Sequence, residues 1–369
     1  MAEQEETARQ RVGERHATLA LTGDVMLGRL MNQVLLTRGP AYPWGNTLPL
    51  LRGADLTLMN LECVIATSGR PWTRWPKAFH FRADPIALDA LQEAGVDFVS
   101  LANNHVLDYG EEALLEMLDR LDAAGIAHAG AGRNRIEAAA PALLDGLRIG
   151  VLAFTDNEPG WAAGDDRPGT NYLPVTTEPE QFERVRHGIA EARQLGAHLV
   201  IISNHWGPNM RERPSPEFRD FARAAIDAGA DLYVGHSAHL FQGVEIHGSR
   251  PILYDAGDFV DDYAVDPVLR NDRSALVLCT VAASGVEDMR LLPVLISEFQ
   301  VNLAAGEEFD ATAARLQQLS AELGTSLIVQ DGALRVASPP FRPRSSHTLS
   351  RPRTSGRPRG RSRQSARKR

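Results

Sequence analysis

Short apolar runs alternate with amphipathic helical patterns along most of this chain, and this alternation limits the folds that it can adopt. The pattern predicts strands at residues 18–22, 56–59, 96–101, 148–154, 198–203, 231–234, 252–254, 274–281 and 289–296. It predicts helices at residues 84–94, 111–124, 179–194, 215–228 and 310–322. Such alternation is typical of a layered domain in which helices cover the strands, so we assign the chain to the α/β class.

Two of the predicted helices have clear signals at their first residues. Asp108 stands three residues before Glu111, which is the spacing of a capping box. Ser215 precedes Pro216, and proline is favoured at the first position of a helix. We therefore expect Asp108 and Ser215 to cap the helices that follow them.

The charge distribution divides the chain into an acidic body and a basic end. The 369 residues carry a net charge of −8, and their number allows one large α/β domain or two smaller ones. Residues 342–369 contain eleven Lys and Arg and no Asp or Glu, which leaves 28 basic against 47 acidic side chains elsewhere, or −19. We expect 1–16 to be a flexible N-terminus and 338–369 a disordered, Arg-rich tail. Such a tail either attracts an anionic partner through salt-sensitive contacts or acts only as a solubilising end.

The cysteine content and the hydropathy favour a cytoplasmic protein. Cys63 and Cys279 are too few for a disulfide framework, and both stand in apolar surroundings that favour burial. No apolar run reaches the roughly 18 residues of a membrane span, and 1–16 lack the apolar core of a secretion signal. We therefore expect a cytoplasmic protein with no membrane span.

Polar side chains follow five of the predicted strands, each within a few residues of the strand's end. These side chains are Asp24, Glu62, Asn104, His205 and His236, and His239 comes three residues after the last of them. Because strands of an open α/β sheet place their carboxyl ends at one edge, we expect these side chains to converge. Imidazole, carboxylate and carboxamide groups are ligands that Mn, Fe and Zn accept. The sequence therefore predicts a metal centre at this edge.

Six segments of the chain, within about residues 18–300, resemble the motifs of a known family. They are Gly23-Asp24, Asn60-Leu61-Glu62, Phe81-Arg82-Ala83-Asp84-Pro85, Asn103-Asn104-His105, Asn204-His205-Trp206-Gly207 and Gly235-His236-Ser237-Ala238-His239. They are similar to the CapA family of poly-γ-glutamate capsule synthesis proteins, which resembles the calcineurin-like metallophosphoesterases. The resemblance implies a four-layer αββα sandwich over residues 17–300. Residues 301–337 are then expected to form a helical extension of that domain.

The resemblance also implies which residues bind the metal. It places Asp24 in the first motif, Glu62 as the bridging acid, Asn104 as the amide ligand, and His205, His236 and His239 as the remaining ligands. Metallophosphoesterases carry a His two residues after the first Asp, whereas this chain has Met26 there. A thioether is a poor ligand for a hard or borderline ion. We therefore expect one firm divalent metal site, formed with Glu62, Asn104, His205 and His236, and a second, weaker one.

The same motifs imply the groups that act on a substrate. His105 occupies the position of the family's general acid, and an imidazole titrates near neutral pH. Asp108, besides its predicted capping role, is a candidate to orient His105. Arg29 and Arg82 are candidates to bind an anionic substrate, because guanidinium groups pair well with phosphate and carboxylate.

Three further residues near these motifs carry expectations of their own. Glu245 is a candidate hydrogen-bond acceptor for His236 or His239, and Trp206 is expected to be a lid over the site rather than a platform for substrate. Asp258 stands where the family more usually has a neutral Asn, so we expect an extra carboxylate at the mouth of the site.

These features favour a metal-dependent hydrolase of phosphoesters or, second to that, of an amide such as a γ-glutamyl bond. Its substrate would be an anionic small molecule or poly-γ-glutamate. The alternative is a non-catalytic accessory protein that binds poly-γ-glutamate or another polyanion during capsule biosynthesis.

Overall fold

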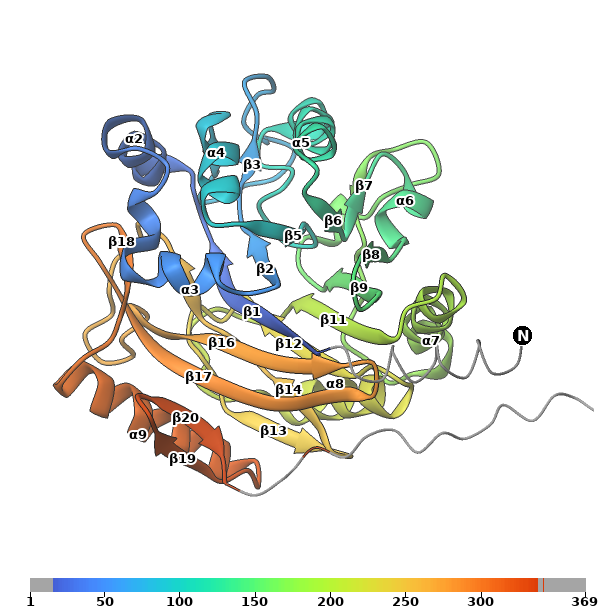
Figure 1. The fold of residues 1–369 in the computed structure, drawn as a ribbon. Helices are drawn as coiled ribbons and strands as arrows, with labels where there is room; N and C mark the ends of the chain where they lie inside the picture. The colour runs from blue at the N-terminus through green and yellow to red at the C-terminus, as the bar shows by residue number, and fades with distance from the viewer. Residues whose placement is uncertain (1–15, 338–340, 342–369) are drawn as a thin grey trace, which may run out of the picture.

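Two β-sheets lie face to face in the computed structural model, which describes residues 16–337 and Phe341 (Figure 1). The first sheet has ten strands, with the order β19-β20-β17-β16-β1-β2-β5-β6, while β15 pairs with β1 and β18 with β17. Its strands are β1 (His16–Val25), β2 (Leu56–Leu61), β5 (Val96–Ser100), β6 (Ala127–Ala129), β15 (Asp258–Val260), β16 (Arg273–Ala282), β17 (Gly285–Ser297), β18 (Gln300–Leu303), β19 (Leu327–Gln330) and β20 (Ala333–Val336).

The second sheet has six strands, in the order β13-β14-β12-β11-β9-β8. They are β8 (Ala142–Leu144), β9 (Ile149–Thr155), β11 (Leu199–His205), β12 (Leu232–His236), β13 (Val244–His247) and β14 (Arg250–Leu253). Two short pairs stand apart from the large sheets: β3 (Val64–Ile65) with β4 (Arg82–Ala83), and β7 (Ala131–Gly132) with β10 (Gly169–Thr170).

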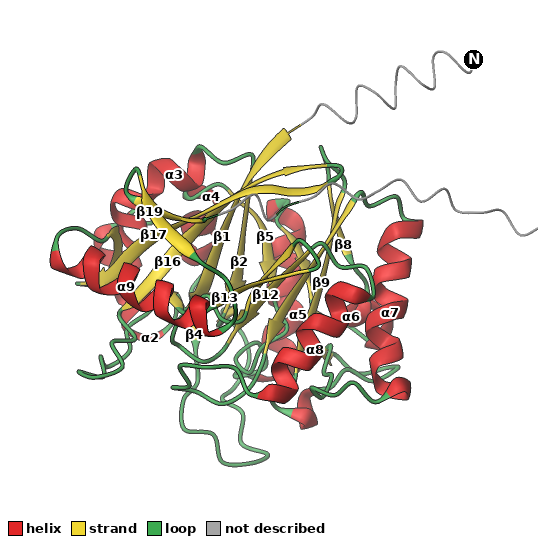
Figure 2. Cartoon of the chain, turned by 90° about the horizontal axis from the view of Figure 1, so that it is seen from below, coloured by secondary structure: helices red, strands yellow, loops and turns green. Residues whose placement is uncertain are grey.

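Helices cover the outer face of each sheet and complete four layers. They are α2 (Arg29–Arg38), α3 (Leu48–Arg52), α4 (Ile86–Glu93), α5 (Gly110–Ala124), α6 (Arg135–Ala139), α7 (Pro179–Gln194), α8 (Pro216–Asp227) and α9 (Glu307–Glu322), with 3-10 turns at Tyr42–Thr47 and Pro159–Trp161. Helices α2, α4 and α5 share a buried apolar cluster with the first sheet. Helices α7 and α8 share another with the second sheet and lie side by side in Figure 2.

The inner faces of the two sheets form the third apolar cluster, in which Leu21, Leu58 and Phe98 of the first sheet pack with Val151 and Ile201 of the second. A sheet that buries apolar side chains on both faces requires near-continuous apolar strands, and β9 and β11 are buried at every residue. The layered packing confirms the αββα fold class that the sequence predicts.

The predicted strands and helices are all present, with boundaries shifted by a few residues at most sites. Helix α7 begins and ends at the predicted residues, and the predicted strand 198–203 extends two residues further as β11, to His205. The segment 301–337, expected as a helical extension, contains more than a helix. After α9, the hairpin of β19 and β20 joins the first sheet through the pairing of Leu334 with Leu291 of β17.

The two capping predictions have different outcomes. The Ser215 hydroxyl accepts a hydrogen bond from the backbone N–H of Phe218 at 3.4 Å, so Ser215 caps α8 as predicted. The capping prediction for Asp108 is wrong, because Tyr109 is the N-cap of α5 and its side chain makes no capping bond. The carboxylate of Asp108 instead accepts a hydrogen bond from the backbone N–H of Phe81 at 2.6 Å.

The register of the parallel strands brings distant motifs to one edge. On β1, Asp24 lies opposite Asn60 of β2 on one side and Asp258 of β15 on the other. In the second sheet, His205 of β11 lies opposite His236 of β12. Both sheets therefore end in polar side chains on the same side of the sandwich.

The remaining expectations concern the cysteines, the membrane and the chain ends. Cys63 and Cys279 are both buried and free, as predicted. Within residues 16–337, no helix has the length and apolar character needed to cross a bilayer. Residues 1–15 of the predicted flexible N-terminus, and all of the predicted Arg-rich tail except Phe341, lie outside the described residues. His16, which was predicted to belong to that N-terminus, is instead the first residue of β1.

Candidate metal centre

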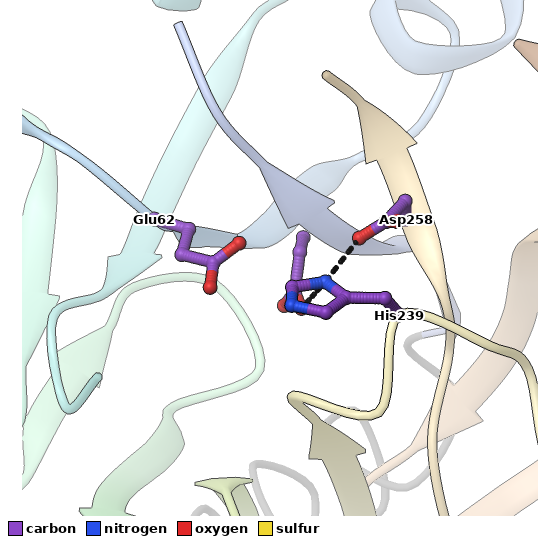
Figure 3. A group of neighbouring side chains, drawn as sticks. Glu62, His239 and Asp258 are labelled. Atoms are coloured by element: carbon purple, nitrogen blue, oxygen red, sulfur yellow. Dashed lines mark hydrogen bonds and ion pairs between the residues drawn. The ribbon is translucent and has the colours of Figure 1, made fainter. Parts of the chain in front are cut away.

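Three carboxylates and an imidazole meet where β1 and β2 end and β15 begins. Asp24, Glu62, His239 and Asp258 each offer a donor atom, and these four atoms all lie within 4.8 Å of one another. Figure 3 shows the side chains of Glu62, His239 and Asp258 pointing toward one another. Asp258 Oδ1 lies 2.8 Å from His239 Nδ1. This spacing is typical of donors that can share one cation.

Two further imidazoles face the same carboxylates from the second sheet. His205 lies 3.8 Å from Glu62 Oε1 through its Nε2 and 3.9 Å from Asp24 Oδ1 through its Nδ1. His236 Nδ1 lies 3.4 Å from Asp24 Oδ1. The fold thus gathers five of the six predicted metal ligands, Asp24, Glu62, His205, His236 and His239, around one space between the two sheets.

Four buried donor atoms, on three of the predicted ligands and on Asp258, have no hydrogen-bond partner among the described residues. They are Glu62 Oε1, Asn104 Oδ1, His236 Nδ1 and Asp258 Oδ2. A buried polar atom without a partner costs about 1–3 kcal/mol, and more if it is charged. Four such atoms on carboxylate, amide and imidazole groups form a donor set that suits a divalent transition-metal ion. The residues present therefore fit the predicted metal, with Asn104 as the sixth predicted ligand.

The acid–base properties of the cluster show how strongly its charges interact. Burial raises the pKa of Glu62 well above its usual range, and the neighbouring Asp24 carboxylate raises it further. Burial also acts to raise the pKa of Asp24, but the neighbouring imidazoles of His236 and His205 outweigh it and lower that pKa. Burial lowers the pKa of His205 to about 3, so this imidazole is neutral. A neutral imidazole beside crowded carboxylates is the form that binds a metal.

Asn60 and the backbone of Ser237 hold the carboxylate of Asp24, and Asn103 holds Asn60. Asn60 Nδ2 donates to Asp24 Oδ1 at 2.8 Å, and Asn103 Nδ2 donates to Asn60 Oδ1 at 3.1 Å. The backbone N–H of Ser237 donates to Asp24 Oδ2 at 3.2 Å. Such partners fix the orientation of metal ligands. Asn60 and Asn103 were not among the predicted site residues, although both stand within the family motifs.

Asp258 is the residue whose position differs most from its expectation. It was expected at the mouth of the site, but it is 0% exposed and lies inside the cluster. Met26 stands where metallophosphoesterases have a His, and it packs in the apolar core. Its Sδ accepts a hydrogen bond from the backbone N–H of Gly28 at 3.2 Å. Asp258 therefore joins Asp24, Glu62 and His239, the predicted ligand group in which Met26 stands in place of a histidine.

His105 and Asp108 form a pair next to the cluster. His105 Nδ1 shares a hydrogen bond with Asp108 Oδ2 at 2.6 Å, and its Nε2 lies 3.8 Å from Glu62 Oε1. Burial raises the pKa of Asp108 to about 7, against the opposing charge of Lys77. The structure thus places Asp108 within hydrogen-bond distance of His105. Burial lowers the pKa of His105 well below its usual range, in contrast to the near-neutral titration that its type of side chain suggested.

Lys77 is a buried cation that sequence analysis did not identify. Its side chain is 7% exposed, and its Nζ lies 2.5 Å from the carbonyl oxygen of Asn104, 3.4 Å from Asp108 Oδ1 and 3.6 Å from Glu158 Oε1. Lys77 lies in the long connection between β3 and β4, so no local pattern links it to the site. It ties the loop that carries Asn104 to the carboxylate that holds His105.

The two predicted substrate-binding arginines have separate locations. Arg29 lines a cavity together with His105 and His239. The guanidinium of Arg82 lies 4.3 Å from the ring centre of Tyr109 and donates to the carbonyl oxygen of Ser68 at 3.3 Å. The structure brings Arg29 to the cluster and does not bring Arg82 there.

The expectations for Trp206 and Glu245 are wrong. Trp206 is buried, donates from Nε1 to the carbonyl oxygen of Tyr254 at 3.0 Å and stacks on Phe218, so it belongs to the core beneath α8. Glu245 accepts hydrogen bonds from Arg223 Nε at 2.8 Å and from the Tyr254 hydroxyl at 2.7 Å. Its carboxylate is therefore used away from His236 and His239.

Comparisons with known proteins agree with the motifs. The family profile described as "Bacterial capsule synthesis protein PGA_cap" matches residues 18–263. The chain is 28% identical over 285 residues to the "Capsule biosynthesis protein CapA" of Bacillus anthracis, which covers 76% of this chain and 68% of that protein. It is 30% identical over 366 residues to a "Probable polyglutamine synthesis accessory protein" of Mycobacterium tuberculosis, covering 86% of this chain and 95% of that protein.

Two further matches complete the comparison. The "PGA biosynthesis protein CapA" of Bacillus subtilis is 29% identical over 283 residues, which cover 76% of this chain and 71% of that protein. The crystal structure of the protein TT1561 from Thermus thermophilus aligns with 73% of this chain and 100% of that chain, at a TM-score of 0.39 and 13% identity. That structural likeness is too low to add to the fold described above. Because the profile spans two thirds of the residues, this chain belongs to the bacterial capsule synthesis protein family PGA_cap.

Proposed function

We propose that this chain is a metal-dependent hydrolase that acts on phosphoesters. The observation that carries the proposal is the set of buried, unpaired donor atoms on Glu62, Asn104, His236 and Asp258, next to the hydrogen-bonded pair of His105 and Asp108. Structural carboxylates are normally paired, whereas a site that binds a cation keeps its donors free for it.

The metal would be held by residues of both sheets. Asp24, Glu62, His239 and Asp258 would form one donor group. His205, which faces Glu62, and His236, which faces Asp24, would form the second together with Asn104. Mn, Fe and Zn are the divalent ions that accept this mixture of ligands. When bound, such an ion supplies Lewis acidity and neutralises charge on a phosphoryl group.

His105 is suited to move a proton during the reaction. Its Nδ1 is fixed by Asp108 at 2.6 Å, while its Nε2 edge faces the cluster and the adjoining cavity. For Nε2 of this neutral imidazole to donate a proton to the oxygen of the leaving group, the ring would take up a proton at Nδ1 from the Asp108 carboxyl, whose pKa burial raises to about 7. Asp108 would thus both orient the ring and supply this proton, and Lys77 holds Asp108 in place.

The test combines metal analysis with turnover. Purified protein is analysed for bound Mn, Fe and Zn, and hydrolysis is measured on phosphomonoesters, phosphodiesters and γ-glutamyl chains. We expect chelation to abolish phosphoester hydrolysis, added Mn²⁺ to restore it, and His105→Ala to reduce it without loss of bound metal. A purified protein that binds no divalent metal would contradict the proposal.

A second candidate function rests on the names of the relatives. The curated relatives are named for capsule or PGA biosynthesis and for an accessory role in synthesis. A non-catalytic protein of poly-γ-glutamate synthesis would bind the polymer through its metal and Arg29. Polymer binding that survives His105→Ala, with no turnover of any phosphoester or γ-glutamyl chain, would favour this function over the first.

A further inference from the structure

A cavity of about 350 Å³ adjoins the cluster of Asp24, Glu62, His239 and Asp258. His105 and His239, which contact the cluster carboxylates, lie at its inner end, and Arg29, Phe79, Phe81 and Tyr263 line its walls. The volume falls at the lower end of the range of small-molecule sites, about 300–1,000 Å³. The cavity therefore has room for a small ligand beside the group that we assign as proton donor.

A row of stacked rings extends from that proton donor toward solvent. The ring of Phe81 stacks on His105 with centroids 3.9 Å apart and planes inclined by 20°. Phe79 stacks on Phe81 at 6.3 Å and 25°. A leaving group that receives a proton from His105 would lie along these rings. A planar, apolar leaving group gains the most there, because offset-stacked rings attract one another beyond the burial of their surface.

The outer ring is exposed, as a binding surface needs to be. Phe79 is 59% exposed, although Phe81 beneath it is buried. The Arg29 guanidinium lies 5.4 Å from the centre of Phe79 and 5.5 Å from that of Phe81, which keeps both rings and the cation in one wall. A ligand that covers Phe79 would remove this apolar face from water.

The charge of the cavity limits how many anionic groups a ligand can carry. Among the described residues that line it, Arg29 is the one arginine, and there is no lysine. Arg29 is already 3.4 Å from Asp262 Oδ1, so part of its charge is compensated. A chain of many carboxylates would find a single guanidinium in this cavity. One phosphate or phosphonate, in contrast, can pair with Arg29 and with a metal held by the cluster.

From these contacts we infer that the cavity selects esters of a single phosphate whose leaving group is planar and apolar, with Phe79 as the residue that sets this preference. The inference rests on the proposed function in one respect, because it takes the phosphate to bind at the metal held by the cluster. It adds the class of substrate, which neither the family nor the motif residues specify.

Binding of two phosphonates, which cannot be hydrolysed as esters, tests the preference without requiring turnover. Phenylphosphonate and methylphosphonate are titrated into the Mn²⁺-loaded full-length protein by calorimetry. We expect phenylphosphonate to bind at least about 10-fold tighter, a factor that corresponds to about 1.4 kcal/mol. Phe79→Ala is expected to remove most of this difference by weakening phenylphosphonate alone. Leu36→Ala, which removes an equally exposed apolar side chain from α2 outside the cavity, is the matched control and should keep the difference.

The outcomes separate this inference from the proposed function. Equal binding of the two phosphonates, or a preference that Phe79→Ala leaves unchanged in a variant with normal metal content, would overturn it. Tighter binding of a γ-glutamyl oligomer than of phenylphosphonate would overturn it in favour of a polymer site. A phenyl preference that depends on Phe79, in a protein that hydrolyses no phosphoester, would uphold the inference while the proposed hydrolase activity fails.

Discussion

His105 Nδ1 and Asp108 Oδ2 lie 2.6 Å apart, and the same carboxylate oxygen accepts the backbone N–H of Phe81 at 2.6 Å. Asp108 is fully buried, so its hydrogen bonds are not weakened by water. The ring of Phe81 stacks on the imidazole from one side. His105 is thus fixed by a hydrogen bond and by ring stacking at once, which is what a group that must present one nitrogen to a substrate requires.

Asp108→Asn is expected to lower kcat for phosphoester hydrolysis by about 10²-fold, within the usual range for a displaced acid–base group, because the amide cannot fix the same imidazole orientation. KM should change little, since Asp108 does not line the cavity. Steady-state kinetics with metal analysis checks this. Asp97→Asn, on the strand that leads to the same loop, is the control and should keep kcat. An unchanged kcat in Asp108→Asn would contradict the orienting role.

Asp258→Ala is expected to lower the metal affinity of one site by at least about 10-fold, because it removes a donor from the group that also contains His239. Bound metal per chain is measured by elemental analysis after dialysis against a defined free Mn²⁺ concentration. Glu245→Gln alters a buried carboxylate outside the cluster and should retain full metal content. If Asp258→Ala binds as much metal as the unmodified protein across the titration, Asp258 is not a ligand.

Lys77→Met is expected to reduce the free energy of unfolding by about 3 kcal/mol, because it leaves the buried carboxylate of Asp108 without its cation. Urea unfolding followed by tryptophan fluorescence measures the change. Lys77→Arg, which keeps the charge, should recover part of the loss. A Lys77→Met protein as stable as the original would show that Lys77 is not needed to balance the Asp108 carboxylate.

Glu116 gives a pH-dependent contribution to stability. Its carboxylate accepts hydrogen bonds from Thr67 and Ser68, and Arg120 donates to it at 2.7 Å. Burial acts to raise the pKa of Glu116, but the hydrogen bonds from Ser68 and Thr67 outweigh it and lower that pKa below its usual 4.5. Because the pKa is lower in the folded state, this stabilisation is present above about pH 4.5 and is lost as the pH falls through the folded value.

Glu116→Gln is therefore expected to cost about 1–3 kcal/mol of unfolding free energy at pH 7, and less as the pH falls below 4.5. Urea unfolding of both proteins at pH 7, 4 and 3 gives the difference at each pH. Glu112→Gln, at an exposed position of the same helix, is the control and should change stability by less than about 1 kcal/mol. A difference that grows toward low pH would have the wrong sign.

Much of the fold follows from local sequence patterns. Helix α7 begins and ends where its periodicity predicts. Strands β9 and β11 are recognisable because a strand buried on both faces needs a near-continuous apolar run. The hairpin of β19 and β20 was not predicted, since strands as short as these carry little periodicity. Their place in the first sheet depends on pairing with β17, which is a tertiary contact.

The sequence by itself determined which residues offer the donor atoms. A side chain at the carboxyl end of a strand in an α/β fold lies at the edge of the sheet, whichever strand is its neighbour. Asp24, Glu62, His205 and His236 meet for this reason. Tertiary structure alone decided the rest. Asp258 enters the cluster because β15 pairs with β1, and Lys77 reaches Asp108 because a long connection folds back over the site. Such contacts join segments far apart in the chain, and no local pattern specifies them.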